Sequence, residues 1–287
     1  MAIAHRSQKH NSVLHKDRVT IIMVASEDYT SFPKAIDRLY EHTDYPFDLI
    51  VVEGQAPHAV QMALEKRVKL YKNMRILYTH HAPLLSEAYN VALAHARTPL
   101  VFFTDNRLIA EKGWLAEIVR TQKLYNCDIL APQITDAEAE PIPAMTGHSF
   151  LATRSSLTLL GEFDDNVQSY YFTLDLSLRA KSKEVDIRFD EAGSIKRDCS
   201  LPTKSADQKL FDRQWAPQFA HNTASYLSQK WGVELDPSEA PRWLENRVKG
   251  GRGAFWGSVR GSLAHLNSSL NYAKLGLTRL MHSLIQI

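Results

Sequence analysis

Residues 100–115 read LVFFTDNRLIAEKGWL, and this stretch decides the fold that we expect. It begins as an apolar run typical of a strand buried in a sheet, and it continues into a helical pattern. Asp105 stands where the predicted strand ends. A carboxylate at this point is either a cap for the following helix, which we expect to begin near Ala110, or one half of a metal site.

Strands and helices alternate on the N-terminal side of this stretch. Runs rich in β-branched residues predict strands, and apolar residues spaced three or four apart predict helices. The predicted strands are residues 19–26, 47–54 and 74–79, and the predicted helices are residues 32–42, 59–71 and 84–96. The alternation predicts an α/β fold with a mostly parallel sheet flanked by helices, because parallel neighbours need a crossover connection.

Acidic residues follow three of these predicted strands. Glu27 and Asp28 follow the first, Glu53 ends the second, and Asp105 ends the fourth. Each alone is explained as a helix cap, but ligands of such sheets bind at the carboxyl ends of the strands, so three together favour a binding site. The chain has no GxGxxG after its first strand and no GxxxxGK[ST], which disfavours a dinucleotide site and a P-loop.

Composition bounds the class of protein. The chain has 287 residues, of which 44% are hydrophobic, and a formal net charge of +2, which disfavours a nucleic-acid partner. Its two cysteines have no CxxC spacing, so we expect neither a disulfide framework nor a cysteine zinc site. Residues 1–17 are expected to be a flexible leader without a secretory signal, and no apolar run is long enough for a membrane span, so we expect a cytoplasmic protein.

Residues 18–200 resemble the family 2 glycosyltransferases of the GT-A fold. The most specific matches are AYNVALAHA at residues 88–96, and LGEFDD at 160–165 together with LDLSLR at 174–179. The resemblance implies transfer of a sugar from a nucleotide-diphosphate donor to a glycan or lipid-linked acceptor, with inversion at the sugar. It also implies a nucleotide-diphospho-sugar transferase type of sheet with a helical C-terminal extension.

The resemblance implies a set of donor-binding residues. Ser26 and Glu27 match the family's nucleoside-binding mouth of the first strand, and Glu53 matches the acid at the end of the second. Asn90 matches a position that shapes the donor pocket. The residues beside Glu53 depart from the family's pattern, which reduces the nucleoside assignment to a single carboxylate.

The family's Asp-x-Asp metal motif falls on Asp105, Asn106 and Arg107. A guanidinium cannot bind a divalent cation, but it can pair with phosphate oxygens. Two interpretations follow. Either Asp105 still binds Mn²⁺ or Mg²⁺ weakly and Arg107 assists the donor diphosphate, or the site has lost its chemistry.

The family's catalytic base is missing from its expected place. Phe172 and Thr173 stand where the family has a Glu-Asp pair, and neither can act as a base at neutral pH. Nearby residues are therefore the candidates for the acceptor side, with Asp175, Asp165 and Asp164 as catalytic carboxylates and His148 beneath the acceptor. Asp175 also matches a helix-capping acid of the family, so its role is open.

The C-terminal third departs from the family pattern. We expect a helical extension over residues 201–250, with one helix over 210–232 stopped by Gly232. Residues 251–287 predict a basic amphipathic helix, because six basic residues and no acidic residue follow Glu245. Residues 254–287 suit an anionic membrane surface, although the same stripe can pack on the core or on a second subunit.

Two functional hypotheses remain open from the sequence. The first is an active glycosyltransferase that uses Glu53 and Asp105 at its donor site. The second is a catalytically inactive glycosyltransferase-like protein that binds a nucleotide sugar or a partner protein, and it is motivated by the missing Glu-Asp pair. The oligomeric state, the sugar and the base are not predicted.

Overall fold

The structure is a computed structural model, and it describes residues 18–135, 149–167 and 171–236, with the side chains of residues 191–194 left out. The predicted leader, His148 and the predicted basic helix at 251–287 lie outside the described residues. Within the described part of the chain, no helix is long and apolar enough to cross a bilayer.

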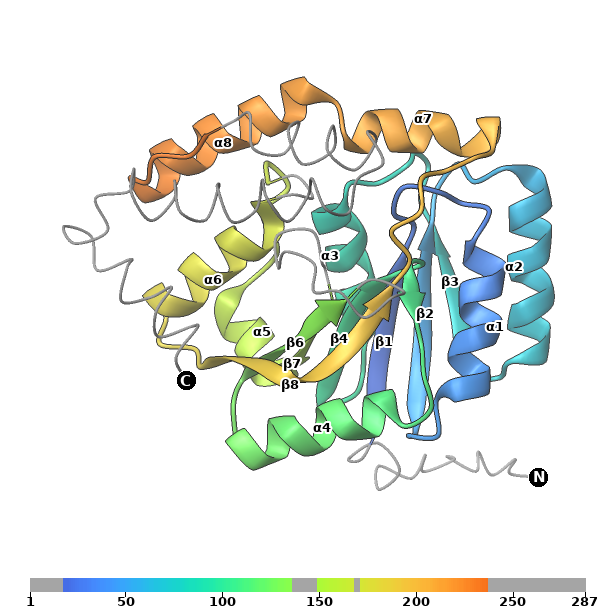
Figure 1. The fold of residues 1–287 in the computed structure, drawn as a ribbon, viewed down its shortest axis with the longest axis horizontal. Helices are drawn as coiled ribbons and strands as arrows, with labels where there is room; N and C mark the ends of the chain where they lie inside the picture. Colours follow the sequence, from blue (N-terminus) through green and yellow to red (C-terminus); the bar gives the residue numbers. More distant parts are fainter. Residues whose placement is uncertain (1–17, 136–148, 168–170, 237–287) are drawn as a thin grey trace, which may run out of the picture.

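An eight-stranded sheet forms the centre of the fold (Figure 1). The strands run in the order β3-β2-β1-β4-β7-β6-β8-β5. In chain order they are Val19–Val24 (β1), Phe47–Glu53 (β2), Met74–Tyr78 (β3), Leu100–Asp105 (β4), Leu108–Ile109 (β5), Ile129–Thr135 (β6), Phe150–Thr153 (β7) and Ile187–Arg197 (β8). The pairings are parallel except those made by β7 and β5, which confirms the predicted mostly parallel sheet.

Helices cover both faces of the sheet, and alternate residues of β1 divide between the two cores. Ile21 and Met23 pack in the core under α1 (Phe32–His42) and α2 (His58–Leu70), whereas Ile22 packs under α3 (Leu85–His95). This two-sided burial explains why the strand sequence is a continuous apolar run rather than an alternating one. The bounds of α1 agree with the prediction, and those of α2 and α3 agree within one residue.

Three further helices complete the two layers. The helix α4 (Trp114–Tyr125) packs in the same core as α1, and α5 (Arg154–Leu160) and α6 (Phe172–Ser182) pack in the core of α3. The prediction of a helix starting near Ala110 was wrong. The chain first forms β5 against the end of β8, and Gly113, with φ of 81°, then turns it into α4.

The predicted single helix over residues 210–232 was wrong. The structure has two helices there, α7 (Ser205–Gln214) and α8 (Pro217–Trp231), which lie end to end above the sheet (Figure 1). The break precedes Pro217, because proline disfavours helical backbone in the residue before it. The predicted stop is confirmed, since Gly232 ends α8 with a left-handed φ of 65°.

Candidate functional site

The carboxyl ends of β1, β2 and β4 lie together at one edge of the sheet. Val24 pairs in register with Val52 on one side and with Asp105 on the other. The predicted site residues Ser26, Glu27, Glu53, Asp105 and Arg107 therefore gather at this edge, and all of them are buried. The ion pairs and hydrogen bonds of these residues determine whether they can bind a metal ion or a phosphate group.

Asp105 is buried, and the guanidinium of Arg197 neutralises its carboxylate. The Arg197 Nη2 atom lies 2.8 Å from Asp105 Oδ2, and the two side chains are 6% and 3% exposed. Burial alone would lower the pKa of Arg197, but the carboxylates of Asp105 and Glu27 raise it above its ordinary value. Asp105 Oδ1 accepts a hydrogen bond from the Arg107 amide, so both carboxylate oxygens have partners within the protein.

Arg107 is a second buried cation, and it faces the first-strand acids. Its Nη2 atom lies 3.0 Å from Asp28 and 3.3 Å from Glu27, and its Nη1 atom lies 3.6 Å from Asp198. Burial raises the pKa of Asp28 even though Arg107 opposes that shift. With a side chain 2% exposed, Arg107 is held by carboxylates of its own chain rather than turned toward solvent.

Ser26 and Asn106 fix the loop that follows β1. Asn106 Oδ1 accepts from the Ser26 amide, and its Nδ2 donates to the Asp28 carbonyl and to the Ser31 hydroxyl. Glu27 has a φ of 66°, which is uncommon for a residue with a side chain. The middle position of the family's metal motif thus holds the backbone of the β1 loop.

Glu53 stabilises its own turn. Its carboxylate accepts a hydrogen bond from the Ala56 amide, and its backbone carbonyl accepts from the Thr79 amide. Gly54 lies against the next loop, where a β-carbon would sit 2.2 Å from both the His81 carbonyl oxygen and the Thr79 hydroxyl. The glycine is therefore required by a close backbone approach.

Asn90 also has a structural role. Its side chain exchanges two hydrogen bonds of 2.8 Å with the backbone of Phe163, donating to the carbonyl and accepting from the amide. This pairing holds the LGEFDD segment against α3. The structure does not place the Asn90 side chain on the lining of the pocket described below.

The predicted acceptor-side carboxylates hold α8 in place. Asp175 is buried and ion-paired with Arg179 at 2.8 Å and Lys230 at 2.9 Å, and it also accepts from the Trp231 indole. Asp164 accepts from Lys230 and from the Tyr226 hydroxyl. Asp165 differs from both because it is exposed.

Asp164 makes the docking of α8 sensitive to acid. Burial would raise the pKa of Asp164, but hydrogen bonds from Lys230 and Tyr226 outweigh it and lower the pKa below 3.8. A carboxyl whose pKa is lower in the folded state stabilises the fold above its unfolded pKa of about 4, and that stabilisation is lost as the pH falls below it. We expect Asp164→Asn to lower the free energy of unfolding by about 1–2 kcal/mol at pH 7 and by progressively less as the pH falls below about 4.

Urea denaturation at several pH values measures this difference. The matched control is Asp165→Asn, which changes the exposed neighbour and should alter stability by less than about 0.5 kcal/mol. A loss for Asp164→Asn that stays constant across the pH series would contradict the assignment.

The helix α7 covers the end of β1. Asp207 accepts from the Tyr29 and Thr30 amides at 2.8 and 3.2 Å and from the Thr30 hydroxyl at 2.6 Å. At the other end of the helix, Gln214 donates to the Ser26 hydroxyl and accepts from the Glu27 amide. Polar contacts at both ends therefore fix α7 over the strand ends.

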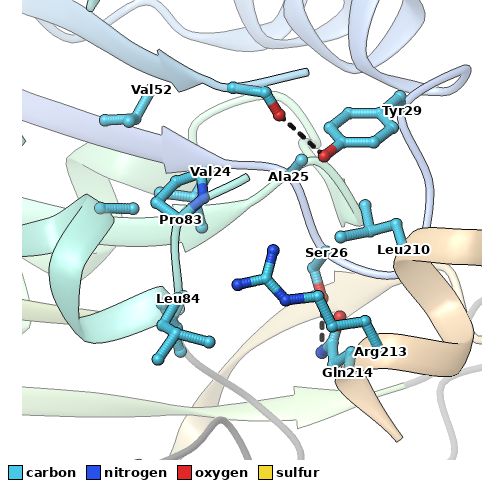
Figure 2. A pocket seen from close by; sticks show the side chains of 13 residues that line it. Val24, Ala25, Ser26, Tyr29, Val52, Pro83, Leu84, Leu210, Arg213 and Gln214 are labelled. Carbon is cyan, nitrogen blue, oxygen red and sulfur yellow. Dashed lines mark hydrogen bonds between the residues drawn. The ribbon is translucent and has the colours of Figure 1, made fainter. Parts of the chain in front are cut away.

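A pocket lies between α7, the start of α3 and the ends of β1 and β2 (Figure 2). Its walls are largely apolar, with Val24, Val52, Leu84 and Ala88 among the lining residues, and Arg213 enters it from α7. The cavity volume is about 50 Å³, well below the roughly 300–1,000 Å³ typical of ligand sites. The enclosed part of the pocket is therefore smaller than a nucleotide.

The residues at this edge do not fit a divalent cation. Such an ion needs several oxygen ligands, yet both oxygens of Asp105 have partners and two guanidinium groups lie among the acids. Within the described ranges, no group of three histidine, cysteine, aspartate or glutamate side chains is arranged to hold a metal.

Sequence reasoning missed the cations that neutralise the predicted acids and the helix that covers the strand ends. Arg197 and Lys230 lie far along the chain from the acids that they pair with, so no local pattern indicates them. A signal for α7 existed, because Asp207, Phe211 and Gln214 lie three or four residues apart and thus share a helix face. A buried acid on that face indicates a partner outside the helix.

Solved structures of other proteins share this fold. The mannosyltransferase PcManGT from Pyrobaculum calidifontis, solved with GDP-Man and Mn²⁺, superposes with a TM-score of 0.58 at 15% identity, covering 96% of this chain and 82% of that one. GalNAc-T7, solved with UDP, GalNAc and Mn²⁺, has a TM-score of 0.54 at 13% identity, covering 83% of this chain and 55% of that one. Residues 1–349 of TarS from S. aureus have a TM-score of 0.51 at 12% identity, covering 79% and 78%.

We call the edge at the carboxyl ends of β1, β2 and β4 the ligand edge, because ligands of open α/β sheets bind there. The sheet order, its two helical layers and this edge define a GT-A type of fold, like that of these glycosyltransferases. A comparison with curated protein sequences finds no significant match. The family model for Glycosyl transferase family 2 matches residues 20–215, and the chain belongs to that family.

Proposed function

We propose that this chain is a catalytically inactive member of its family that binds a nucleotide or nucleotide sugar at the pocket beside β1 and β2. The observation that carries this proposal is the internal ion pairing of the ligand edge. Arg197 is committed to Asp105, and Arg107 is committed to Glu27 and Asp28. The acids are then not available for a metal, and both guanidinium groups are balanced by carboxylates before any donor binds, although Arg107 Nε and Nη2 and Arg197 Nε have no hydrogen-bond partner among the described residues.

The surroundings of the missing base support the same proposal. Phe172 is buried, and its ring packs against the rings of Tyr89, Phe150 and Phe163. Asp175, the next carboxylate along α6, is 1% exposed and held by two cations. A base must reach the proton that it removes, and Asp175 is turned into the protein instead.

The position and walls of the pocket support a nucleotide as the ligand. Ligands of open α/β sheets bind outside the carboxyl ends of the strands, where this pocket lies. Its apolar lining suits the flat face of a base, and Ser26, Gln214 and Arg213 are polar residues among those that line it.

A second candidate function is transfer of a sugar without a metal. Asp165 favours it, because this exposed carboxylate stands on the segment that leads to α6, where a base is needed. In this candidate the donor is a nucleotide sugar, and the acceptor is a glycan or a lipid-linked glycan. Residues 254–287 would then hold the enzyme on an anionic membrane surface.

Calorimetric titration with UDP, GDP and their sugar derivatives tests the proposal. We expect binding whose affinity is the same with Mn²⁺ and with EDTA, and no released or transferred sugar in a parallel product assay. Ala25→Leu, which fills the pocket, should weaken binding by at least about tenfold, because its side chain and the ligand need the same space. The control Ala94→Leu makes the same change at an exposed position on α3.

Three results would count against the proposal. Sugar transfer at any metal concentration would favour the second candidate, and loss of transfer in Asp165→Asn would then identify the base. Binding that requires Mn²⁺ would mean that Asp105 leaves Arg197 to hold the ion. If no nucleotide binds, the pocket is not a nucleotide site, and the chain would instead be a protein with a glycosyltransferase fold that binds a partner protein.

A further inference from the structure

Three arginines lie at or near the ligand edge, and two of them have carboxylate partners. Arg197 pairs with Asp105 at 2.8 Å, and Arg107 pairs with Asp28 at 3.0 Å. Arg107 Nε and Nη2 and Arg197 Nε have no hydrogen-bond partner among the described residues, but each of these guanidinium groups has little net charge left for a ligand, because a carboxylate partner cancels its field at short range. The third arginine, Arg213, differs from both.

Arg213 lies near the end of α7 and lines the pocket. Figure 2 shows its side chain extending from α7 into the pocket, toward Leu84 at the start of α3. Its Nη1 atom donates to the backbone carbonyl of Ala82, and no carboxylate of the described residues lies within 4 Å of it. A guanidinium has five N–H donors, so most of those of Arg213 remain for another acceptor.

The acids of the edge do not compete for Arg213. Glu27 and Asp105 are directed toward Arg107 and Arg197, and Glu53 accepts from its own turn. None of these three acids lines the pocket, where Arg213 is the one charged side chain from the described ranges. The pocket therefore combines apolar walls with a single positive charge.

We propose that Arg213 is the residue that binds the phosphate groups of the ligand. The residues of the edge do not fit a metal ion, so the guanidinium of Arg213 neutralises the phosphate charge instead. The inference rests on the proposed function, since it needs a nucleotide in the pocket. Arginine pairs with phosphate oxygens through two parallel hydrogen bonds, which fixes orientation as well as charge. The apolar walls then hold the base, and Arg213 selects ligands that carry phosphate.

The attachment of α7 places this guanidinium. Asp207 and Gln214 tie the two ends of α7 to the loop after β1, with Arg213 next to the second tie. When a nucleotide binds, the bond from Arg213 to Ala82 is exchanged for bonds to phosphate. Arg213 is thus a binding and positioning residue rather than a catalytic one.

The test compares ligands with and without phosphate. Uridine, guanosine, UDP and GDP are titrated, in EDTA, into the wild type, Arg213→Gln and Arg213→Lys. We expect Arg213→Gln to weaken UDP or GDP binding by at least about tenfold and to leave nucleoside binding within about twofold, because a hydrogen-bonded charge is lost only for the phosphate. Arg213→Lys should lie between, because it keeps the charge without the two-pronged geometry.

The matched control is Lys209→Gln, which removes a positive charge from the exposed side of the same helix and should change neither affinity. Circular dichroism establishes that each variant folds, and the salt dependence of the wild type gives a readout that needs no variant. Rising salt should weaken diphosphate binding and leave nucleoside binding unchanged.

Two failures are distinguishable. If the wild type binds neither nucleosides nor diphosphates, the proposed function is wrong and this inference falls with it. If the wild type binds a diphosphate but Arg213→Gln binds it equally well, or nucleoside and diphosphate bind with one affinity at every salt concentration, the role of Arg213 alone is overturned.

Discussion

Replacing Arg197 by methionine should lower the free energy of unfolding by about 3–5 kcal/mol. The change leaves the carboxylate of Asp105, whose side chain is 3% exposed, without the cation 2.8 Å away. An unpaired buried charge costs more than the pair contributes, because desolvation of the ion is no longer offset. The Ser26 hydroxyl also loses its contact with Arg197, at 3.4 Å. Urea denaturation followed by circular dichroism measures the effect.

Two controls separate this mechanism from a general loss of packing. The double variant Asp105→Asn with Arg197→Met removes the charge and keeps an acceptor for the Arg107 amide, so it should recover a large part of the loss. Arg188→Met breaks the partly exposed pair of Arg188 and Asp186 and should cost no more than about 1 kcal/mol. If Arg197→Met proves no more costly than Arg188→Met, then Asp105 is not neutralised by Arg197 and the metal interpretation returns.

Replacing Gly54 by alanine should have the second large effect, a loss of about 3 kcal/mol or more in the free energy of unfolding. The new β-carbon would meet the His81 carbonyl oxygen and the Thr79 hydroxyl at 2.2 Å. The clash cannot be relieved by a rotamer change, because one of the two atoms belongs to the backbone. The loops after β2 and β3 would have to separate, and the hydrogen bond from Thr79 to the Glu53 carbonyl spans them.

A second glycine provides the comparison. Gly161 has a φ of 81° and a ψ of −169° with nothing within 4 Å of an added β-carbon, so Gly161→Ala tests backbone strain alone and should cost about 1–3 kcal/mol. A shift in the denaturation midpoint that is larger for Gly161→Ala than for Gly54→Ala would mean that the two loops are not packed as described.

The sequence predicted the N-terminal half of the fold well. The helix α1 has its predicted bounds, and each of the first three strands lies within its predicted range. These elements are specified locally, by apolar periodicity and by turn residues, so a short window contains the information that forms them. The C-terminal half was harder, because β5 and the break between α7 and α8 depend on a neighbouring strand and on a single proline.

The sequence predicted where the candidate site residues lie, but it did not predict which of their charges pair with one another. Strand ends meet at one edge in any parallel sheet of this kind, so the sequence could locate Glu53 and Asp105 there. It indicated that a guanidinium at Arg107 cannot bind a metal, but it could not say whether that guanidinium faces a diphosphate or its own acids. The structure pairs it with Glu27 and Asp28.

The sequence by itself determined the N-terminal strands and helices, the α/β architecture and the acidic edge, because each follows from residues near one another in the chain. Only the tertiary structure decided which charges cancel. Arg197 lies 92 residues from Asp105, and Lys230 lies 55 residues from Asp175. Such pairs depend on which strand lies beside which and on where α7 and α8 rest, and the strength of an ion pair depends on burial, which no local pattern contains.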